Sequence, residues 1–450
     1  MRYLSTRGQA PECGFTDALL SGLAPDGGLY LPIAWPQVDV GAAAYDDVAL
    51  RILKGFAGGD FPDDALKADV AAAYAGFDDP RIAPLVEIAP GRFLLELFHG
   101  PTLAFKDIAM QVLGRLFARA LAERGGRATV LAATSGDTGS AAIAALGGLP
   151  NIEVFVMHPL GRITEVQRRQ MTTAPHANIH NIALEGSFDD AQALVKALFA
   201  DAAFAGKVGL TAVNSINFAR IAAQSVYYFT ATATLGTPAT FVVPTGNFGD
   251  VFAGEAAMRM GLSIERLVVA TNANDIMARA LNDGIYEAGP ARRTLSPSMD
   301  IQVASNFERA LFEASGRDAA YVREAMGGTR IALPAPIRAD LAGRYGAHAV
   351  DDARTLETIA RVHAGTGRLI DPHTAVGVAA AEQVRSRGPV VVLSTAHPAK
   401  FPDVVRRATG QIPALPPRLS GLMEAPEKFD VLGPDLGLVR SYIAARVPAA

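Results

Sequence analysis

Residues 128–146 read ATVLAATSGDTGSAAIAAL, and this stretch decides the fold class. Its first part, Ala128–Ala133, is small and mostly apolar without strict alternation, which predicts a strand buried on both faces. A loop with two glycines follows, and Ser140–Leu146 then predicts a helix. The same succession of apolar run and helical stretch recurs around Val154–Met157, Phe241–Pro244, Leu267–Ala270 and Val390–Leu393. Doubly buried strands that alternate with helices indicate an α/β fold with open, mostly parallel sheets flanked by helices.

The length of the chain predicts more than one structural unit. With 450 residues, 50% of them hydrophobic, the chain can bury a large core. We expect an N-terminal accessory domain over residues 1–85, a catalytic region over residues 86–405 and a C-terminal wrap over residues 406–450. The catalytic region is expected to comprise two α/β lobes, the smaller at about residues 106–225. The wrap is expected to end in a helix near Leu436–Arg446.

Charge and cysteine content exclude several kinds of partner. The 41 Lys and Arg residues nearly balance 45 Asp and Glu residues, so nucleic acid and anionic membranes are not expected partners. Cys13 is the only cysteine, which excludes a disulfide framework or a thiolate zinc site within one chain. No metal site is expected, and the expected location is cytoplasmic.

One uncharged stretch needs an interpretation of its own. Residues 221–249 contain no charged side chain, but Gly236, Pro238 and Pro244 interrupt them. A lipid-facing helix of this length would not favour such breaks. We therefore interpret the stretch as a buried helix followed by a buried strand.

A lysine precedes the glycine-bearing loops at a distinctive position. Residues 98–107 read FHGPTLAFKD, and apolar residues then recur at three- and four-residue steps through Ala120. This pattern places Lys106 at or just before a helix N-terminus, where the helix dipole destabilises an ammonium and favours the neutral amine. On position alone, a surface lysine that pairs with an acidic neighbour is the more common alternative.

Two glycine-bearing loops lie between a predicted strand and a predicted helix. Backbone N–H groups at such helix starts bind anions without basic side chains. The loop TGNFGD at residues 245–250 suits a phosphate and matches neither of the G-x-x-x-x-G-K-[ST] and G-x-G-x-x-G patterns of nucleotide-binding loops. The loop TSGDTGS at residues 134–140 adds hydroxyls and suits an amino-acid carboxylate. For either loop alone, a tight turn or plain helix capping is an equal alternative.

Together, the lysine and the two loops predict a pyridoxal phosphate enzyme. Such an enzyme must hold the cofactor by its phosphate, join it to an amine and place it beside an amino-acid substrate. Ligands of parallel sheets collect at the carboxyl ends of the strands, where both loops are expected. Thr395 follows the apolar run at residues 390–394 and could offer its hydroxyl to the pyridine nitrogen, although an ordinary strand-end threonine is the alternative.

Five motifs in this order resemble threonine synthase, most of all its bacterial and fungal class. They are residues 98–107, 134–139, 214–217 (NSIN), 246–250 (GNFGD) and 395–401 (TAHPAKF). The similarity begins at YLSTRG, residues 3–8, and extends to about Phe401. The resemblance implies the tryptophan-synthase β-like fold, fold type II. It also implies a carbon–oxygen lyase that converts O-phospho-L-homoserine and water into L-threonine and phosphate, the last step of threonine biosynthesis.

The resemblance also implies roles for individual residues. Lys106 is implied to carry pyridoxal 5′-phosphate and to move the Cα and Cβ protons as a general base and acid. The implied cofactor-binding residues are Lys106, Gly246, Asn247, Phe248, Gly249, Asp250 and Thr395. The implied substrate-binding residues are Ser135, Asp137 and Thr138 at the carboxylate or the cofactor O3′, and Ser215, Asn217 and Arg220 at the phosphate.

Other polar residues near the motifs receive weaker assignments. Arg162 and Lys400 are further candidates for the substrate phosphate, although an ordinary salt bridge is the more common role of any one such residue. We interpret His99, His158 and His373 as structural, since lone histidines are more often packed or hydrogen-bonded than catalytic.

Two other functions stay open at this stage. An enzyme with the same cofactor could release 2-oxobutyrate from phosphohomoserine or threonine, and the product would distinguish it. A non-enzymatic ligand-binding or regulatory α/β protein could have kept the scaffold. An intact Lys106 and phosphate loop argue against it, and a colourless protein with no bound cofactor would favour it. We expect a small-molecule substrate and a monomer or homodimer.

Overall fold

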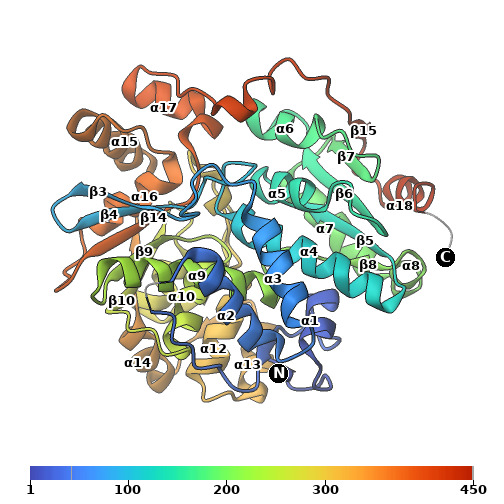
Figure 1. Ribbon diagram of the computed structural model, residues 1–450, viewed down its shortest axis with the longest axis horizontal. Helices are drawn as coiled ribbons and strands as arrows, with labels where there is room; N and C mark the ends of the chain where they lie inside the picture. Colours follow the sequence, from blue (N-terminus) through green and yellow to red (C-terminus); the bar gives the residue numbers. More distant parts are fainter. Residues whose placement is uncertain (42, 448–450) are drawn as a thin grey trace.

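Two α/β lobes make up the centre of the molecule (Figure 1). The computed structural model describes residues 1–41 and 43–447. The larger lobe contains a six-stranded sheet in the order β13-β10-β9-β14-β4-β3, parallel throughout except for the β3–β4 hairpin. Its strands are β3 (Leu85–Ala89), β4 (Arg92–Glu96), β9 (Thr240–Pro244), β10 (Arg266–Thr271), β13 (Tyr345–Ala349) and β14 (Val390–Ser394). Three of the strands expected from sequence thus lie side by side as β10, β9 and β14.

The smaller lobe contains a five-stranded sheet in the order β15-β7-β6-β5-β8, with parallel neighbours throughout. Its strands are β5 (Ala128–Ala133), β6 (Ile152–Pro159), β7 (Ile179–Leu184), β8 (Leu210–Thr211) and β15 (Asp430–Leu432). The observed bounds of β5 are those predicted from the sequence. The edge strand β15 comes from the C-terminal segment, where no strand was expected.

Helices cover both faces of each sheet because the strands are apolar on both faces. In β5, the neighbouring residues Val130 and Leu131 point to opposite faces of the sheet. Val130 packs in the hydrophobic core with α4 (Lys106–Arg124) and α5 (Asp137–Leu146). Leu131 packs in a second hydrophobic cluster with α7 (Phe188–Ala200) and α18 (Leu436–Ala444). In β9, Val243 packs with α9 (Phe218–Leu235) and α10 (Gly249–Arg259), whereas Val242 packs with α15 (Asp352–Thr366) and α16 (Pro372–Ala381). The predicted parallel sheets with two covered faces are confirmed.

The uncharged stretch at residues 221–249 forms most of α9, all of β9 and the loop that follows. The interpretation as a buried helix and a buried strand is therefore confirmed. None of the helices in the described ranges combines the length and the apolarity that a bilayer crossing requires.

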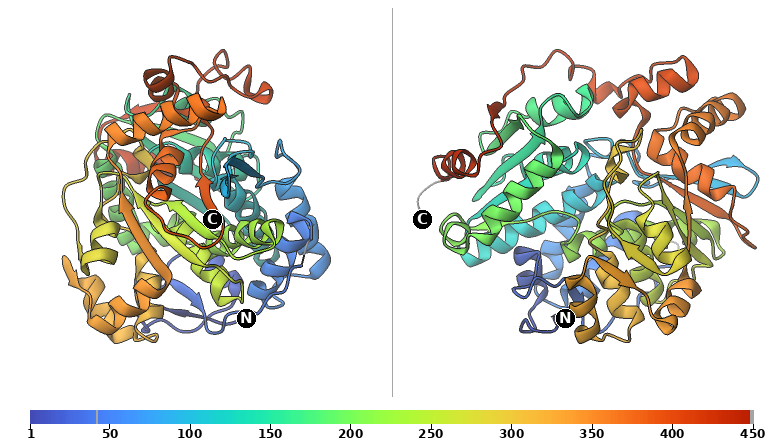
Figure 2. Two further views of the ribbon diagram at one scale, coloured as in Figure 1. Left: turned by 90° about the vertical axis from the view of Figure 1, so that its left-hand side faces the viewer. Right: turned by 180° about the vertical axis from the view of Figure 1, so that it is seen from behind.

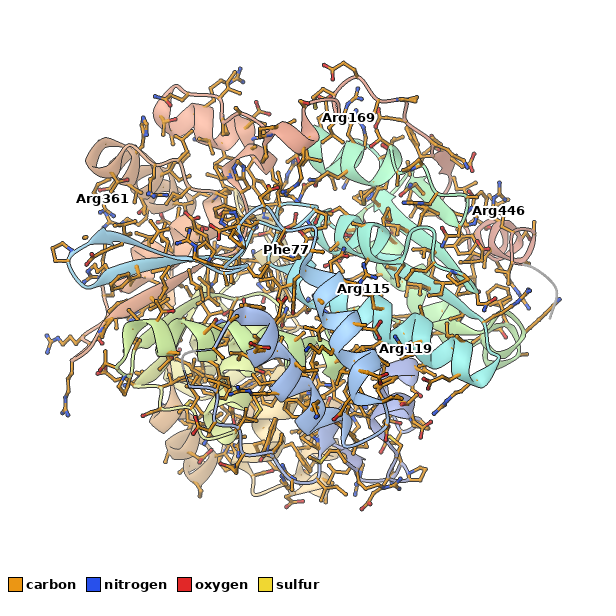
Figure 3. The ribbon with its side chains drawn as sticks, viewed as in Figure 1. Phe77, Arg115, Arg119, Arg169, Arg361 and Arg446 are labelled. Carbon is orange, nitrogen blue, oxygen red and sulfur yellow. The ribbon has the colours of Figure 1, made fainter. Side chains whose placement is uncertain are left out.

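The N-terminal region packs on helices of both lobes. The helix α2 (Tyr45–Ala57) packs against α9, and α3 (Asp63–Tyr74) packs against α4. Arg119 of α4, labelled in Figure 3, pairs with Asp69 of α3 at 2.5 Å. The apolar side chains of α2 and α3 belong to the same core as those of α4 and α9. This region is therefore continuous with the core of the lobes.

The C-terminal segment joins the two lobes. After α17 (Pro402–Thr409), which packs on α15, the chain crosses to the smaller lobe and adds β15 and α18 there (Figures 1 and 2). Along the way Glu427 pairs with Arg168 of α6 (Glu165–Thr172) at 2.8 Å, and Arg418 donates to the carbonyl of Gly100. The helix expected near residues 436–446 corresponds to α18.

The remaining elements are short and lie around this frame. They are β1 (Tyr3–Ser5), β2 (Tyr30–Pro32), β11 (Ile285–Glu287), β12 (Arg330–Ala332), α1 (Phe15–Ser21), α8 (Ala202–Val208), α11 (Ile276–Asp283), α12 (Phe307–Ala314), α13 (Ala319–Gly327), α14 (Ala335–Arg344), η1 (Pro297–Met299), η2 (Pro398–Lys400) and η3 (Pro417–Leu419).

Candidate active site

Lys106 is the first residue of α4, as predicted, and its side chain is almost completely buried. The segment before it pairs with the segment after β14. The N–H of Phe105 donates to the carbonyl of Thr395 at 2.8 Å, and the N–H of His397 donates to the carbonyl of Leu103 at 3.0 Å. These bonds place Thr395 next to the start of α4.

A buried carboxylate fixes the turn that leads into Lys106. Asp107 accepts hydrogen bonds from the N–H of Thr102 at 2.8 Å and from its hydroxyl at 2.6 Å. Burial raises the pKa of Asp107 to about 6. A Cβ at Gly100 would lie 2.4 Å from the Cβ of Asp107, so this turn requires glycine. This role of Asp107 was not predicted from the sequence.

The carboxylate of Asp137 connects four separate elements. Its Oδ1 forms an ion pair with Nζ of Lys400 at 3.0 Å and accepts a hydrogen bond from Nε2 of Gln167 at 2.8 Å. Its Oδ2 accepts from Nζ of Lys106 at 3.3 Å and from Oγ of Ser298 at 3.1 Å. These donors come from η2, α6, α4 and η1 respectively. Because two lysines already occupy this carboxylate, only the backbone N–H of Asp137 is left for a substrate anion.

Burial and the neighbouring charges shift the pKa values of Lys106 and Asp137. Burial lowers the pKa of Lys106; Asp137 opposes that shift, and Lys400 and Arg220 add to it. Burial alone would raise the pKa of Asp137, but Lys400 and Lys106 hold it well below its usual range. The site therefore keeps an ionised carboxylate beside a lysine that loses its proton more easily than an exposed one.

The loop after β9 presents a row of backbone donors. In the described chain, the N–H groups from Gly246 to Asp250 donate to no protein acceptor, and the first turn of α10 lies directly behind them. Phe248 adopts a left-handed conformation, with φ of 62°, which turns successive N–H groups inward. Asn306 holds the loop by donating its backbone N–H to the carbonyl of Asn247 at 3.0 Å. This arrangement suits a phosphate.

Two side chains of this loop point into the core instead. Asp250 is buried between Tyr227 and Tyr228, whose hydroxyls both donate to its Oδ1. Phe248 packs against Phe307 and Tyr345 at ring-centroid distances of 5.5 and 5.3 Å. Residues 246–250 can therefore hold a phosphate through their backbone, while the side chains of Phe248 and Asp250 stabilise the loop.

The loop after β5 presents a second set of donors. The hydroxyl of Thr134 accepts from the N–H groups of Gly136 and Gly139, both at 2.9 Å. Within the described residues, the N–H groups of Ser135, Asp137 and Thr138 have no protein acceptor, and they lie at the start of α5. The side chains of Ser135 and Thr138 are half-buried. This geometry suits a carboxylate.

Residues 214–220 contribute one buried cation and one half-buried hydroxyl. Arg220 is buried; in the described chain its Nε lacks a partner, and its Nη1 donates only to the carbonyl of Val213 at 3.4 Å. Burial lowers the pKa of Arg220 to about 10. Ser215 is half-buried, and its carbonyl accepts from Nδ2 of Asn306 at 3.0 Å. The charge of Arg220 contributes to the lowered pKa of Lys106.

Asn217 has a different role from the one predicted. Its Oδ1 accepts from the N–H of Ala219 at 3.1 Å at the start of α9, and its Nδ2 donates to the carbonyl of Leu19 at 2.8 Å. The side chain has no exposed surface. Helix capping therefore replaces the predicted contact with the substrate.

The two further candidates for binding the substrate phosphate, Arg162 and Lys400, differ in their burial. Arg162 is exposed in the turn after β6, whereas Lys400 is fully buried against Asp137. His373 is structural, as interpreted: its Nε2 accepts from the N–H of Ser298 at 3.1 Å, and its Nδ1 pairs with Asp371 at 2.7 Å.

Two side chains that donate to Asp137, those of Gln167 and Ser298, were not predicted from the sequence. Gln167 carries a visible signal, because Thr164 and Gln167 form a capping box at the start of α6, but that signal predicts only a helix start. Ser298 carries no signal of this kind. Their contribution depends on contacts between distant segments.

Three family models match successive parts of the chain. The one described as threonine synthase N terminus matches residues 2–74, and the one described as pyridoxal-phosphate dependent enzyme matches residues 81–396. The third, described as threonine synthase, C-terminal, matches residues 374–443.

Individual relatives and structures agree with these matches. A threonine synthase of Pseudomonas aeruginosa is 47% identical over 460 residues, covering 99% of this chain and 98% of its own. A solved structure of pyridoxal-phosphate-bound threonine synthase from Brucella melitensis matches with a TM-score of 0.97 and 49% identity over 100% of both chains. Threonine synthase from yeast matches with a TM-score of 0.93 and 36% identity, covering 99% of this chain and 98% of its own. On these grounds, the chain belongs to the threonine synthase family of fold type II pyridoxal-phosphate-dependent enzymes.

Proposed function

We propose that this chain converts O-phospho-L-homoserine and water into L-threonine and phosphate with pyridoxal 5′-phosphate as cofactor. The observation that carries the proposal is Lys106, buried beside Asp137 and close to two loops of free backbone donors and to Arg220. The cofactor, when bound, supplies an electron-withdrawing ring that acidifies C–H bonds of the attached amino acid. The other contributions come from residues of the chain.

The residues of the site fit this cofactor. Its phosphate is assigned to the N–H groups of residues 246–250, where the partial positive charge at the start of α10 replaces a basic side chain. Its pyridine nitrogen is assigned to the hydroxyl of Thr395, which the bond from Phe105 holds near Lys106. A neutral hydroxyl does not force a proton onto the ring, which limits the electron demand of the cofactor.

Substrate binding requires sites for two anions. The carboxylate is assigned to the N–H groups and hydroxyls of Ser135 and Thr138 at the start of α5. The phosphate is assigned to Ser215 and Arg220. The guanidinium of Arg220 retains an unpartnered Nε in the described chain, and a buried donor without an acceptor favours a bound oxyanion.

Lys106 is assigned the proton transfers at Cα and Cβ of the substrate. A proton shuttle works best when its pKa lies near the working pH, and burial together with Lys400 and Arg220 lowers the pKa of Lys106 in that direction. Water then adds at Cβ after phosphate has left from Cγ.

Analysis of the products tests this function. Purified protein loaded with pyridoxal phosphate is incubated with O-phospho-L-homoserine, and amino acids, oxo acids and phosphate are quantified. The proposal predicts equal amounts of threonine and phosphate. Release of 2-oxobutyrate in place of threonine, or no organic product, would reject it while leaving the family assignment intact.

The phosphate site is tested separately with Arg220→Gln. Removing a charged donor of this kind costs about 1.5–3 kcal/mol, so the KM for phosphohomoserine should rise roughly ten- to a hundredfold. The exposed Arg162 provides the matched control, because Arg162→Gln should leave KM unchanged. Equal effects of both substitutions, or no effect of either, would argue against this site.

A further inference from the structure

The candidate active site contains a second buried lysine, Lys400, which has no role in the reaction proposed above. Lys400 is the last residue of η2, and its side chain has no exposed surface. Its Nζ lies 3.0 Å from Oδ1 of Asp137 and donates to the carbonyl of Thr102 at 2.7 Å. Lys106 approaches the other oxygen of the same carboxylate at 3.3 Å. Two buried lysines therefore share one carboxylate.

We propose that Lys400 is a positioning residue that permanently neutralises Asp137, so that Lys106 can stay an unprotonated amine. The proposal rests on the proposed function only in that Lys106 is the residue that carries the cofactor. An amine must be unprotonated to attack the cofactor aldehyde, and an exposed lysine with a pKa near 10.4 is unprotonated in only about one molecule in a thousand at pH 7.4.

The balance of charges identifies which lysine gives up its proton. One carboxylate can neutralise only one ammonium, and a further buried charge without a partner is strongly disfavoured. Nζ of Lys400 forms a 3.0 Å ion pair with Asp137 and donates to the carbonyl of Thr102 at 2.7 Å, whereas Nζ of Lys106 lies farther from Asp137, at 3.3 Å. Arg220 adds another positive charge near Lys106. The surplus proton is therefore the one on Lys106.

The surroundings of Asp137 keep this arrangement in place. Gln167 donates to Oδ1 at 2.8 Å and Ser298 donates to Oδ2 at 3.1 Å, so the carboxylate cannot turn to follow Lys106. Asp137, Lys400 and Arg220 have the largest influence among the charged groups around Lys106, and the carboxyl of Asp250 also interacts with it. The direction of the pKa of Lys106 agrees, since burial, Lys400 and Arg220 lower it against the opposing effect of Asp137.

The pKa of Lys106 can be measured without cofactor or substrate. The apoprotein is exposed to trace acetic anhydride at a series of pH values, and acetylation of Lys106 is quantified by peptide mass spectrometry. Only the unprotonated amine reacts, so the midpoint of the curve reports the pKa. In Lys400→Met, Asp137 has Lys106 as its only lysine partner, and the midpoint should rise by at least one pH unit, a tenfold loss of free amine at neutral pH.

Two further variants separate electrostatics from damage to the fold. Lys400→Arg keeps the charge and should keep the midpoint near that of the parent protein. The double variant Lys400→Met/Asp137→Asn removes both charges and should return the midpoint toward the parent value. If Lys400→Met fails to fold, Lys400→Gln, which keeps a donor for the carbonyl of Thr102, takes its place in the same comparison.

The outcomes are decisive in both directions. An unchanged midpoint in Lys400→Met, or a raised midpoint that the double variant does not reverse, overturns the role of Lys400. Because no turnover is measured, a protein that makes a different product would still show the predicted shift. Failure of the proposed function and failure of this inference are therefore distinguishable.

Discussion

Replacing Asp250 by asparagine should remove a component of stability that decreases as pH rises. Asp250 lies in the first turn of α10, fully enclosed, with the hydroxyls of Tyr227 and Tyr228 both donating to its Oδ1. In the described chain its Oδ2 has no hydrogen-bond partner. Asparagine has the same shape, can accept both tyrosine bonds through its oxygen and does not titrate.

The size of the effect follows from the pKa of the buried carboxyl. Burial raises the pKa of Asp250 from 3.8 to about 7, although the two tyrosines, Lys106 and Arg220 oppose that shift. The folded protein thus holds this proton more tightly than the unfolded chain. Its contribution to stability is fully present below pH 4 and decreases as pH rises to about 7, because each pH unit between these values costs about 1.4 kcal/mol. The whole change amounts to about 4 kcal/mol, of which about 2 kcal/mol falls between pH 5 and pH 7 because the carboxyl is already half ionised in the folded protein at pH 7.

Urea unfolding of the apoprotein at pH 5, 6, 7 and 8 measures this change. All other titrating groups are common to both proteins, so the difference in unfolding free energy between the parent and Asp250→Asn isolates the carboxyl. The asparagine variant should gain stability relative to the parent as pH rises to 7, and the gain should then level off. Asp189→Asn, at an exposed position in α7, is the matched control and should follow the parent at every pH. Parallel profiles for parent and Asp250→Asn would refute the reasoning.

Three further substitutions test the assignments of individual residues. Lys106→Ala should abolish turnover and the absorbance of the lysine-bound cofactor while leaving the far-UV circular dichroism unchanged; near-normal turnover would contradict its role. Thr395→Asp should protonate the pyridine ring and divert part of the product to side reactions, seen in the absorbance spectrum and in the ratio of products; an unchanged spectrum and ratio would count against the contact. Gly246→Ala would place a methyl group 2.7 Å from the carbonyl of Ser298, so the affinity for pyridoxal phosphate should fall at least tenfold in a titration of the apoprotein. Gly206→Ala, where a methyl group meets nothing within 4 Å, is the control, and equal affinities of the two variants would contradict the phosphate assignment.

The frame of the fold could be predicted because each strand carries its own signal. Residues 128–133, 241–244, 267–270 and 390–393 are apolar without alternation, and all four lie in parallel sheets with two covered faces. The edge strand β15 could not be predicted in this way, since Asp430–Leu432 is short and exposed in part. Its pairing with β7 depends on the path of the C-terminal segment across the smaller lobe. A local pattern contains no information about such a path.

In the candidate site, too, features contained in one short segment could be predicted, and features that depend on contacts between distant segments could not. The two candidate anion sites could be proposed from the sequence because their donors are consecutive backbone N–H groups, so that one short segment contains all the donors of a site. Asn217 illustrates the limit: its sequence position suited a phosphate, yet its amide caps α9 and bonds to Leu19, far away in the chain.

The protonation states of the groups in the site cannot be predicted from local sequence patterns. Asp137 has the sequence of a helix-capping residue, and what makes it an ionised partner of two lysines is the meeting of α4, α6, η1 and η2 around it. No spacing within one segment encodes that meeting. It follows that sequence patterns indicate candidate anion sites more readily than they indicate which groups carry protons. The proposed acid–base chemistry of Lys106 depends on contacts that exist only in the assembled lobes.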